Sequence, residues 1–175
     1  MAHGTNVWDA CIAIDGGIMA KPKANKLAVS KDNWETPDSF FKYWDDIYKF
    51  DGDCAATMEN KKTHSYLSNA FEEPWYRMGW CNPPFSEKDK FIDKAIEETE
   101  CGNKTLMLLP ASTGALWFKK AIENCSLVVF VVGRLRFKGA PSSADFDTCL
   151  FLFEKKWPGR TPHVEWLELE PKYRK

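Results

Sequence analysis

Apolar residues along the chain follow two spacings, and the two alternate. Spacings of three and four residues are typical of helices that bury one face, whereas short apolar runs are typical of buried strands. Helical spacing occurs at 37–48, 87–101 and 116–122. Strand-like runs occur at 50–56, 78–81, 105–109, 127–132 and 148–153. This alternation predicts an α/β domain with a mostly parallel sheet and an antiparallel end, because the last run can return beside the one before it.

Local signals predict where the helices begin. Thr36 and Pro37 have the residue types of an N-cap and a first helical position, and Ser86 with Asp89 has the spacing of a capping box directly after Phe85. The apolar residues of the first and third helices, Ile47 and Leu116 among them, are expected to face the core. The glutamates of the second helix, Glu98 among them, are expected to face water.

The two ends of the chain carry weaker patterns. Residues 1–33 have no convincing period and are predicted to form a weakly structured arm, which leaves 34–175 as a single domain. The arm contains Lys21, Lys23, Lys26 and Lys31, so it could touch DNA phosphate, and a solvated extension is the alternative. Residues 164–169 alternate between apolar and polar types and could add an edge strand.

Composition narrows the class of protein. The chain has 175 residues, of which 44% are apolar and 28% charged, as in one globular domain. The net charge is −1, so any nucleic-acid site must be a local basic patch. The six cysteines include no C-x-x-C pair and have no histidine at metal-ligand spacing, so we expect no metal site. No membrane span or signal peptide is visible, and we expect a cytoplasmic protein.

The strongest candidate for chemistry is Asn82-Pro83-Pro84-Phe85, which follows the strand at 78–81 and therefore lies at its carboxyl end. A conjugated amino group such as adenine N6 is barely nucleophilic, and it needs hydrogen-bond acceptors rather than a strong base. The prolines hold the backbone rigid, so the Asn82 side chain and nearby carbonyls can accept the amino hydrogens. The Phe85 ring can stack on a flipped base. A plain turn after a strand is the alternative.

Two further segments carry candidate residues. Asp51 and Asp53, followed by Cys54 and Ala55, suit a strand end that binds a ribose or an ammonium group, although no G-x-G pattern is present and an Asp-Gly turn is the alternative. The segment 133–138 alternates basic and apolar residues and suits phosphate contact beside a stacking ring. A charge-protected edge strand is its alternative.

Taken in order, the motifs W-x-T-P, F-D-x-D-x-A-A, N-P-P-F-S, L-L-P-A and G-R-L-R-F resemble those of the small phage DNA adenine-N6-methyltransferases, a Dam-like family, over roughly residues 33–153. The resemblance implies a Rossmann-like methyltransferase fold, S-adenosylmethionine as methyl donor, and duplex DNA with a flipped adenine as substrate. A phage-encoded member would act in the host cytoplasm. The usual glycine-rich loop of methyltransferases is absent.

The resemblance also assigns roles to residues. It places Asn82, Pro83, Pro84 and Phe85 around the target adenine. It places Trp34, Thr36, Pro37, Asp51, Asp53, Cys54 and Ala55 around the cofactor. It places Arg134, Arg136, Phe137 and Lys138 on the DNA side.

Three functions are open on these grounds. The first is methylation of adenine N6 in DNA. The second is the same chemistry on cytosine N4, RNA or a protein amide, since N-P-P-aromatic segments also occur in such enzymes. The third is a catalytically inactive DNA-binding module, which the missing glycine-rich loop suggests.

Overall fold

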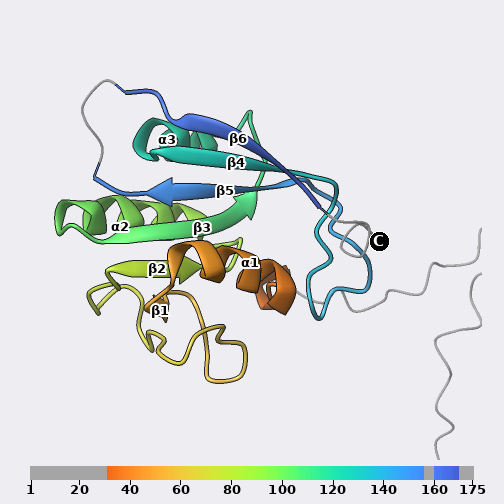
Figure 1. The fold of residues 1–175 in the computed structure, drawn as a ribbon, viewed down its shortest axis with the longest axis horizontal. Helices are drawn as coiled ribbons and strands as arrows, with labels where there is room; N and C mark the ends of the chain where they lie inside the picture. Colours follow the sequence, from red (N-terminus) through yellow and green to blue (C-terminus); the bar gives the residue numbers. More distant parts are fainter. Residues whose placement is uncertain (1–30, 156–159, 170–175) are drawn as a thin grey trace, which may run out of the picture.

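A computed structural model describes residues 31–155 and 160–169. It contains one six-stranded sheet with the strand order β1-β2-β3-β5-β4-β6 (Figure 1). The strands are β1 Gly52–Asp53, β2 Met78–Cys81, β3 Lys104–Pro110, β4 Leu127–Val132, β5 Thr148–Phe153 and β6 His163–Glu168. β5 runs antiparallel to both of its neighbours, and the other strands run in one direction. The predicted α/β architecture with a mostly parallel sheet is confirmed, and it is consistent with a Rossmann-like methyltransferase fold.

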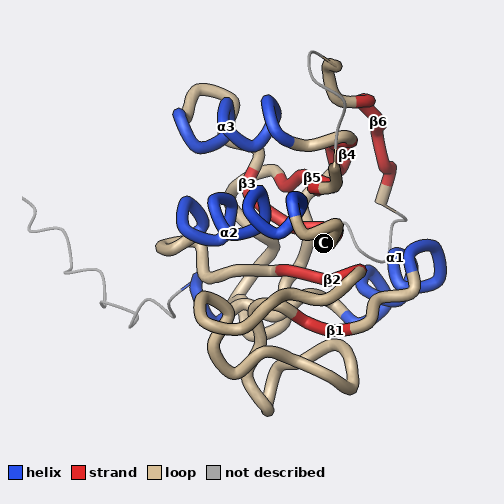
Figure 2. The backbone as a smooth tube through the Cα atoms, turned by 90° about the vertical axis from the view of Figure 1, so that its left-hand side faces the viewer, coloured by secondary structure: helices blue, strands red, loops and turns tan. Residues whose placement is uncertain are grey.

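The helices cover both faces of the sheet. They are the short 3₁₀ helix η1 Lys31–Asn33, α1 Asp38–Tyr48, α2 Lys88–Glu100 and α3 Leu116–Asn124. Figure 2 shows α2 and α3 on one face and α1 on the other. Successive residues of a strand point to opposite faces. In β3, Leu106 and Leu108 therefore pack with α1, whereas Met107 and Leu109 pack with α2 and α3.

The order of the C-terminal strands explains the long apolar runs. β5 lies between β3 and β4, so it is buried on both faces and paired along both edges. The predicted return of 148–153 beside 127–132 is confirmed, with Val128 opposite Phe151 in the register. β6 adds the expected edge strand, parallel to β4.

Both helix starts were predicted too early. α1 begins at Asp38 after Pro37, and Thr36 is buried instead of capping the helix. α2 begins at Lys88, with no side-chain cap. The predicted capping box is wrong because Phe85 to Glu87 form a turn, in which the Glu87 N–H donates to the carbonyl of Pro84 at 2.9 Å.

Three helical side chains face the opposite way from their prediction. Ile47 lies in the last turn of α1, beyond the buried stripe that ends at Trp44, and is exposed. Leu116 is the first residue of α3 and is 86% exposed. Glu98 is buried, and its carboxylate is compensated by Lys94 Nζ at 2.6 Å and by the Asn103 amide at 2.7 Å. A buried carboxylate needs such partners, and the pattern of residue types did not reveal them.

The domain includes part of the predicted arm. Residues 31–33 form η1, and Lys31 Nζ lies 2.7 Å from Asp145 Oδ1. The expectations for residues 1–30, including the arm's lysines before Lys31, lie outside the described residues. Within the ranges that the structure describes, no helix is both long and apolar enough to cross a membrane.

Candidate active site

A cleft of about 320 Å³ opens beside the carboxyl ends of β1 and β2. This is the edge of a parallel sheet at which α/β proteins bind ligands, and the volume is typical of small-molecule sites. Its walls come from the segment before α1, from the loops that follow β1, and from the end of β2 with the residues after it. The lining residues are Asp32–Thr36, Asp53–Thr57, Asn60, Lys62, Leu67–Phe71, Trp80, Asn82, Pro84 and Phe91.

The cleft brings together most of the residues predicted to contact the cofactor or the adenine, although these lie in three separate parts of the sequence. Trp34, Thr36, Asp53, Cys54 and Ala55 of the predicted cofactor set line it, as do Asn82 and Pro84 of the predicted adenine set. The residues of these sets that do not line it are Pro37, Asp51, Pro83 and Phe85. Asp51 has a backbone role instead, because its Oδ2 accepts the N–H of Met78 at 3.0 Å.

One wall of the cleft was missed by the sequence analysis. Residues 67–71 contain none of the predicted site residues, yet they line the cleft, and Phe71 packs on Phe91 at 4.8 Å between ring centroids. The loop is fixed by long-range backbone bonds: the Leu67 N–H donates to Asp53 O and the Asp53 N–H donates to Ser65 O, both at 3.0 Å. No local sequence signal marks such a pairing.

The Asn82 side chain has one satisfied end and one unsatisfied end. Its Nδ2 donates to the carbonyl of Trp34 at 3.0 Å, and its buried Oδ1 has no hydrogen-bond partner. Because a carbonyl can only accept, the amide is fixed with its NH₂ group toward Trp34. An unpaired buried acceptor costs about 1–3 kcal/mol. The structure therefore retains, at this cleft, an acceptor suited to an incoming N–H donor.

The rest of the N-P-P-F segment is held by its neighbours. The Ser86 N–H donates to Asp32 Oδ1 at 3.0 Å, and Lys88 Nζ donates to the carbonyl of Phe85 at 2.9 Å. Asp32 belongs to η1, so the segment that precedes α1 contacts this loop at Ser86 as well as at Asn82. Two separate bonds from one segment fix both ends of the tetrapeptide.

The Phe85 ring belongs to an aromatic cluster next to the cleft. It packs edge-to-face with Phe137 and Phe146, at 6.1 and 5.4 Å between centroids. Trp34 stacks on Phe146 at 6.0 Å with 14° between the planes, and the Lys31 ammonium lies 5.1 Å from the centre of the Phe146 ring. The ring predicted to stack on a base therefore has other rings as its present neighbours.

Asp53 is a carboxylate held in a dry site. It is 3% exposed, and its two oxygens accept the N–H groups of Ala55 and Lys62 at 3.2 and 3.1 Å. Burial raises its pKa from 3.8 to about 6, and the two N–H groups and the nearby Lys62 charge limit that rise. At neutral pH the carboxylate is ionised but poorly solvated, which suits it to a ligand hydroxyl or cation.

The basic segment after β4 is only partly arranged as predicted. Leu135 and Phe137 point inward, and Arg134, Arg136 and Lys138 point outward. The expectation that Phe137 offers a stacking surface beside phosphate is wrong, because its ring is 2% exposed and packs against the core. The segment is not a strand, apart from one antiparallel bridge between Lys138 and Glu35.

The arginines line a second, shallow concavity. Its lining residues are Arg134, Arg136 and Ser142–Asp145. Asp145 is itself one of these lining residues, and the Oδ1 of Asp147 lies 3.9 Å from Arg134 Nε. Such an exposed, weakly paired guanidinium remains able to bind an anion.

The described residues contain no group of three or more His, Cys, Asp or Glu side chains arranged to hold a metal ion. The cysteines of the described ranges are free thiols, and four of them are buried. Burial raises the pKa values of Cys54, Cys81 and Cys149, so these thiols stay protonated and act as small apolar side chains.

The six-stranded sheet, with the N-P-P-F segment at its carboxyl edge, is consistent with a Rossmann-like methyltransferase fold. Residues 23–167 match the model of the family described as DNA N-6-adenine-methyltransferase (Dam). The chain belongs to this family. A methyltransferase family requires a methyl donor, and this family acts on DNA.

Two phage proteins named DNA N-6-adenine-methyltransferase are similar to the chain. The protein of Escherichia phage T1 is 37% identical over 107 residues, which cover 58% of this chain and 45% of that protein. The protein of Haemophilus phage HP1 (strain HP1c1) is 31% identical over 149 residues, which cover 78% of this chain and 86% of that protein. The chain thus matches less than half of the T1 protein and most of the HP1 protein.

The dry environment of Asp53 predicts a specific pH dependence. The folded protein should hold the Asp53 proton up to about pH 6, whereas the unfolded chain releases it near pH 3.8. Asp53 therefore contributes stability at low pH that is lost as the pH rises through this window, by on the order of 3 kcal/mol. The stability of Asp53→Asn relative to the unchanged protein should therefore rise by about this amount between pH 4 and pH 7. An NMR titration that puts the Asp53 carboxyl midpoint below pH 4 would contradict the prediction.

Proposed function

We propose that the protein transfers a methyl group from S-adenosylmethionine to N6 of adenine in duplex DNA. The observation that carries this proposal is the unpaired, buried Oδ1 of Asn82, which lies in the same cleft as the Asp53 carboxylate. Asn82 Oδ1 suits an amino donor, and the Asp53 carboxylate suits a cofactor that carries a cation or hydroxyl groups. The family match and the two phage relatives support the same reaction.

The residues of the cleft fit the cofactor. S-adenosylmethionine carries a sulfonium, an ammonium and ribose hydroxyls, and the desolvated carboxylate of Asp53 can bind the latter two kinds of group. Trp34 and Thr36 would contact it from one wall, and Cys54 and Ala55 from the other. When bound, the cofactor supplies an electrophilic methyl group with a good leaving group. Pro37 and Asp51 do not line the cleft, so in this proposal they hold the backbone around it rather than contact the cofactor.

The Asn82 side chain prepares the amino group. Its Oδ1 accepts one N6 hydrogen, and a backbone carbonyl of Asn82 or Pro83 accepts the other. These two acceptors draw the nitrogen toward tetrahedral geometry and direct its lone pair to the methyl group. Because the bond to Trp34 already fixes the amide, no reorganisation is needed at the moment of transfer. As N6 bonds to the methyl carbon, the bond from that carbon to the donor sulfur breaks, and the surplus N6 proton would pass to water, so a titrating base is not required.

A flipped target base would reach this site by replacing one of the aromatic rings that now contact Phe85. Phe85 now packs against Phe146, so a flipped adenine that lies on Phe85 takes the place of Phe146. A base stacked on an aromatic side chain contributes about 1–3 kcal/mol, whereas an aromatic pair contributes about 0.5–1.5 kcal/mol. Phe146 also contacts Trp34 and Phe137, so the hydrogen bonds that the base makes at Asn82 must help to offset the loss of these contacts.

The arginines after β4 contact the DNA backbone in this proposal. Arg134 and Arg136 are exposed at the same carboxyl edge of the sheet as the cleft. Phosphate contacts of this kind set the orientation of the duplex and carry no sequence information. The phage relatives and the buried free thiols support a place in the cytoplasm of a bacterial host.

The alternatives that the sequence left open gain no support. An inactive module has no use for a buried, unpaired acceptor, which costs stability when nothing binds to it. Cytosine N4, RNA and protein amides would require the same acceptor, but the family and the named relatives favour adenine in DNA.

Replacement of Asn82 tests the assignment of the acceptor. Asn82→Ala should lower kcat by about 100- to 1,000-fold, because one preorganised polar contact to the reacting group is lost. The Kd for S-adenosylmethionine should stay close to that of the unchanged protein. Asn82→Asp keeps an acceptor for the amino group but places a carboxylate oxygen against the Trp34 carbonyl, so its activity should lie between those of the unchanged protein and Asn82→Ala. Loss of cofactor binding together with turnover would count against the assigned role.

Replacement of Arg136 tests the DNA side. Arg136→Gln should weaken duplex binding and reduce the slope of log K against log salt by about 1, as expected for one lost phosphate contact. Arg77→Gln is the matched control, since Arg77 is exposed just before β2, at the opposite edge of the sheet. Equal salt slopes for the two variants would remove Arg136 from the interface.

A further inference from the structure

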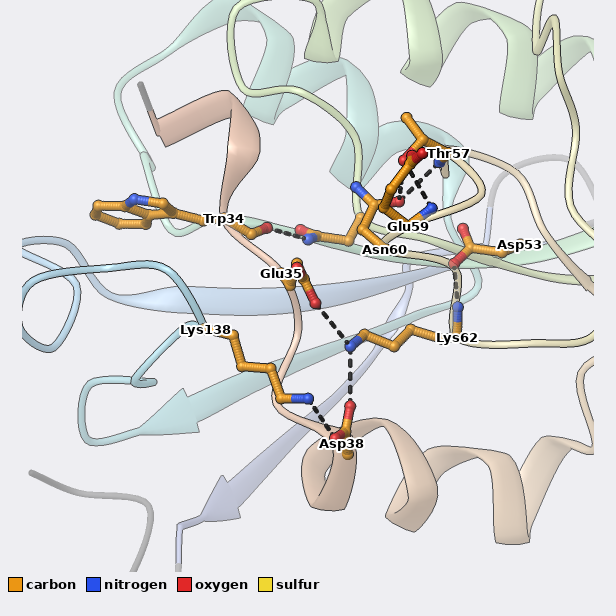
Figure 3. Close-up of polar contacts among 10 residues, drawn as sticks. Trp34, Glu35, Asp38, Asp53, Thr57, Glu59, Asn60, Lys62 and Lys138 are labelled. Atoms are coloured by element: carbon orange, nitrogen blue, oxygen red, sulfur yellow. Dashed lines mark hydrogen bonds and ion pairs between the residues drawn. The ribbon is translucent and has the colours of Figure 1, made fainter. Parts of the chain in front are cut away.

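Lys62 has a largely buried side chain, and lysine side chains are rarely buried in proteins. Its side chain is 8% exposed, and its Nζ lies 2.9 Å from Asp38 Oδ1 and 3.5 Å from Glu35 Oε2. Figure 3 shows the side chain reaching from its loop to a point between these two carboxylates. A buried ion pair contributes little net stability, because the loss of hydration offsets the attraction. We therefore expect the main effect of the Lys62 ion pairs to be on the relative position of the chain segments that they join, rather than on stability.

The residue connects the two walls of the cleft. Its backbone N–H donates to Asp53 Oδ2 at 3.1 Å, within the wall that we assign to the cofactor. Its ammonium group binds the segment 35–38, which directly follows Trp34, the residue whose carbonyl fixes Asn82. Among the described residues, the ion pairs that join loop 54–64 to segment 34–38 are those of Lys62.

Segment 35–38 is fixed on its other side. The Glu35 N–H donates to Lys138 O at 3.2 Å, and the Lys138 N–H donates to Glu35 O at 2.9 Å. The Lys138 ammonium also binds Asp38 (Figure 3). The contacts with Lys138 already fix segment 35–38. The ion pairs of Lys62 therefore position loop 54–64 relative to that segment.

We propose that Lys62 is a positioning residue, which holds the cofactor wall of the cleft at the correct distance from the wall that carries Asn82. This inference rests on the proposed function, since it assumes that the methyl donor and the amino group meet in this cleft. Lys62 acts through the loop and through segment 35–38, and it does not itself take part in the transfer.

The substitution Lys62→Met tests the proposal without removing the fold. Methionine keeps an unbranched apolar chain in the same space. The carboxylates of Glu35 and Asp38 are 34% and 67% exposed, and Asp38 keeps Lys138 as a partner. Water can therefore solvate them, and the thermal midpoint should stay near that of the unchanged protein.

Binding and kinetics should both change in Lys62→Met. We expect the Kd for S-adenosylmethionine, measured by calorimetry, to rise about tenfold or more, and kcat to fall by up to about 100-fold, since a displacement of about 1 Å has effects of that size. The Kd for duplex DNA should not change. Lys62→Arg should restore most of the cofactor affinity. A purely structural role would lower the active fraction and leave both Kd and KM unchanged.

Two controls make the result specific. Lys61→Met is the same substitution one residue away, where the ammonium donates to the carbonyl of His64 and lies over the ring of Tyr66, and it should leave cofactor binding unchanged. The double variant Glu35→Gln, Asp38→Asn removes the same ion pairs from the other wall, together with the ion pair between Asp38 and Lys138. It should weaken cofactor binding to a similar extent, and adding Lys62→Met to it should have little further effect.

An analogue separates positioning from direct contact. If Lys62 bound the carboxylate of the cofactor, Lys62→Met would have no effect on the binding of decarboxylated S-adenosylmethionine. We expect the same fold-loss with both compounds, and a loss confined to the carboxylated form would overturn the proposal. So would an unchanged Kd in Lys62→Met. If the unchanged protein itself does not bind S-adenosylmethionine, the proposed function fails, and this inference fails with it.

Discussion

The hydrogen bond from Asn82 to the carbonyl of Trp34 is the contact on which the site depends. It joins the end of β2 to the segment before α1, which are 48 residues apart in the sequence. It also decides which end of the amide faces Trp34 and which end is left unpaired. The wall that contains Trp34 contacts the loop that contains Asp53 through Lys62, so both candidate ligand groups are oriented from this one segment.

Several polar groups among the residues that line the cleft are held at a cost to stability, and two of them are suited to bind a ligand. Asn82 Oδ1 is buried without a partner, and Asp53 is ionised in a site that raises its pKa. An amino donor would satisfy the first group and a cation or hydroxyl would satisfy the second. Proteins retain such costs where function requires them. The positions of both groups in one cleft are consistent with the ligand site that we propose.

Local patterns were sufficient to predict the order of the main elements and several of the residues that line the cleft. The apolar runs of β3, β4 and β5 predicted buried strands, and the prolines after Cys81 predicted a rigid segment at a strand end. Long-range contacts decided the rest. Ser86 does not cap α2 because the chain turns after Phe85, Phe137 is buried because Trp34 and Phe146 pack on it, and residues 67–71 reach the cleft through bonds to Asp53. The spacing of residue types does not encode such pairings.

The most direct measurement of the central claim follows the methyl group itself. Purified protein would be incubated with S-adenosylmethionine labelled in the methyl group and with unmethylated duplex DNA, which would then be digested to nucleosides and separated. We expect the label in N6-methyl-2′-deoxyadenosine and in no other nucleoside. Label in cytosine, or an absence of label in DNA from a protein that binds the cofactor, would contradict this expectation.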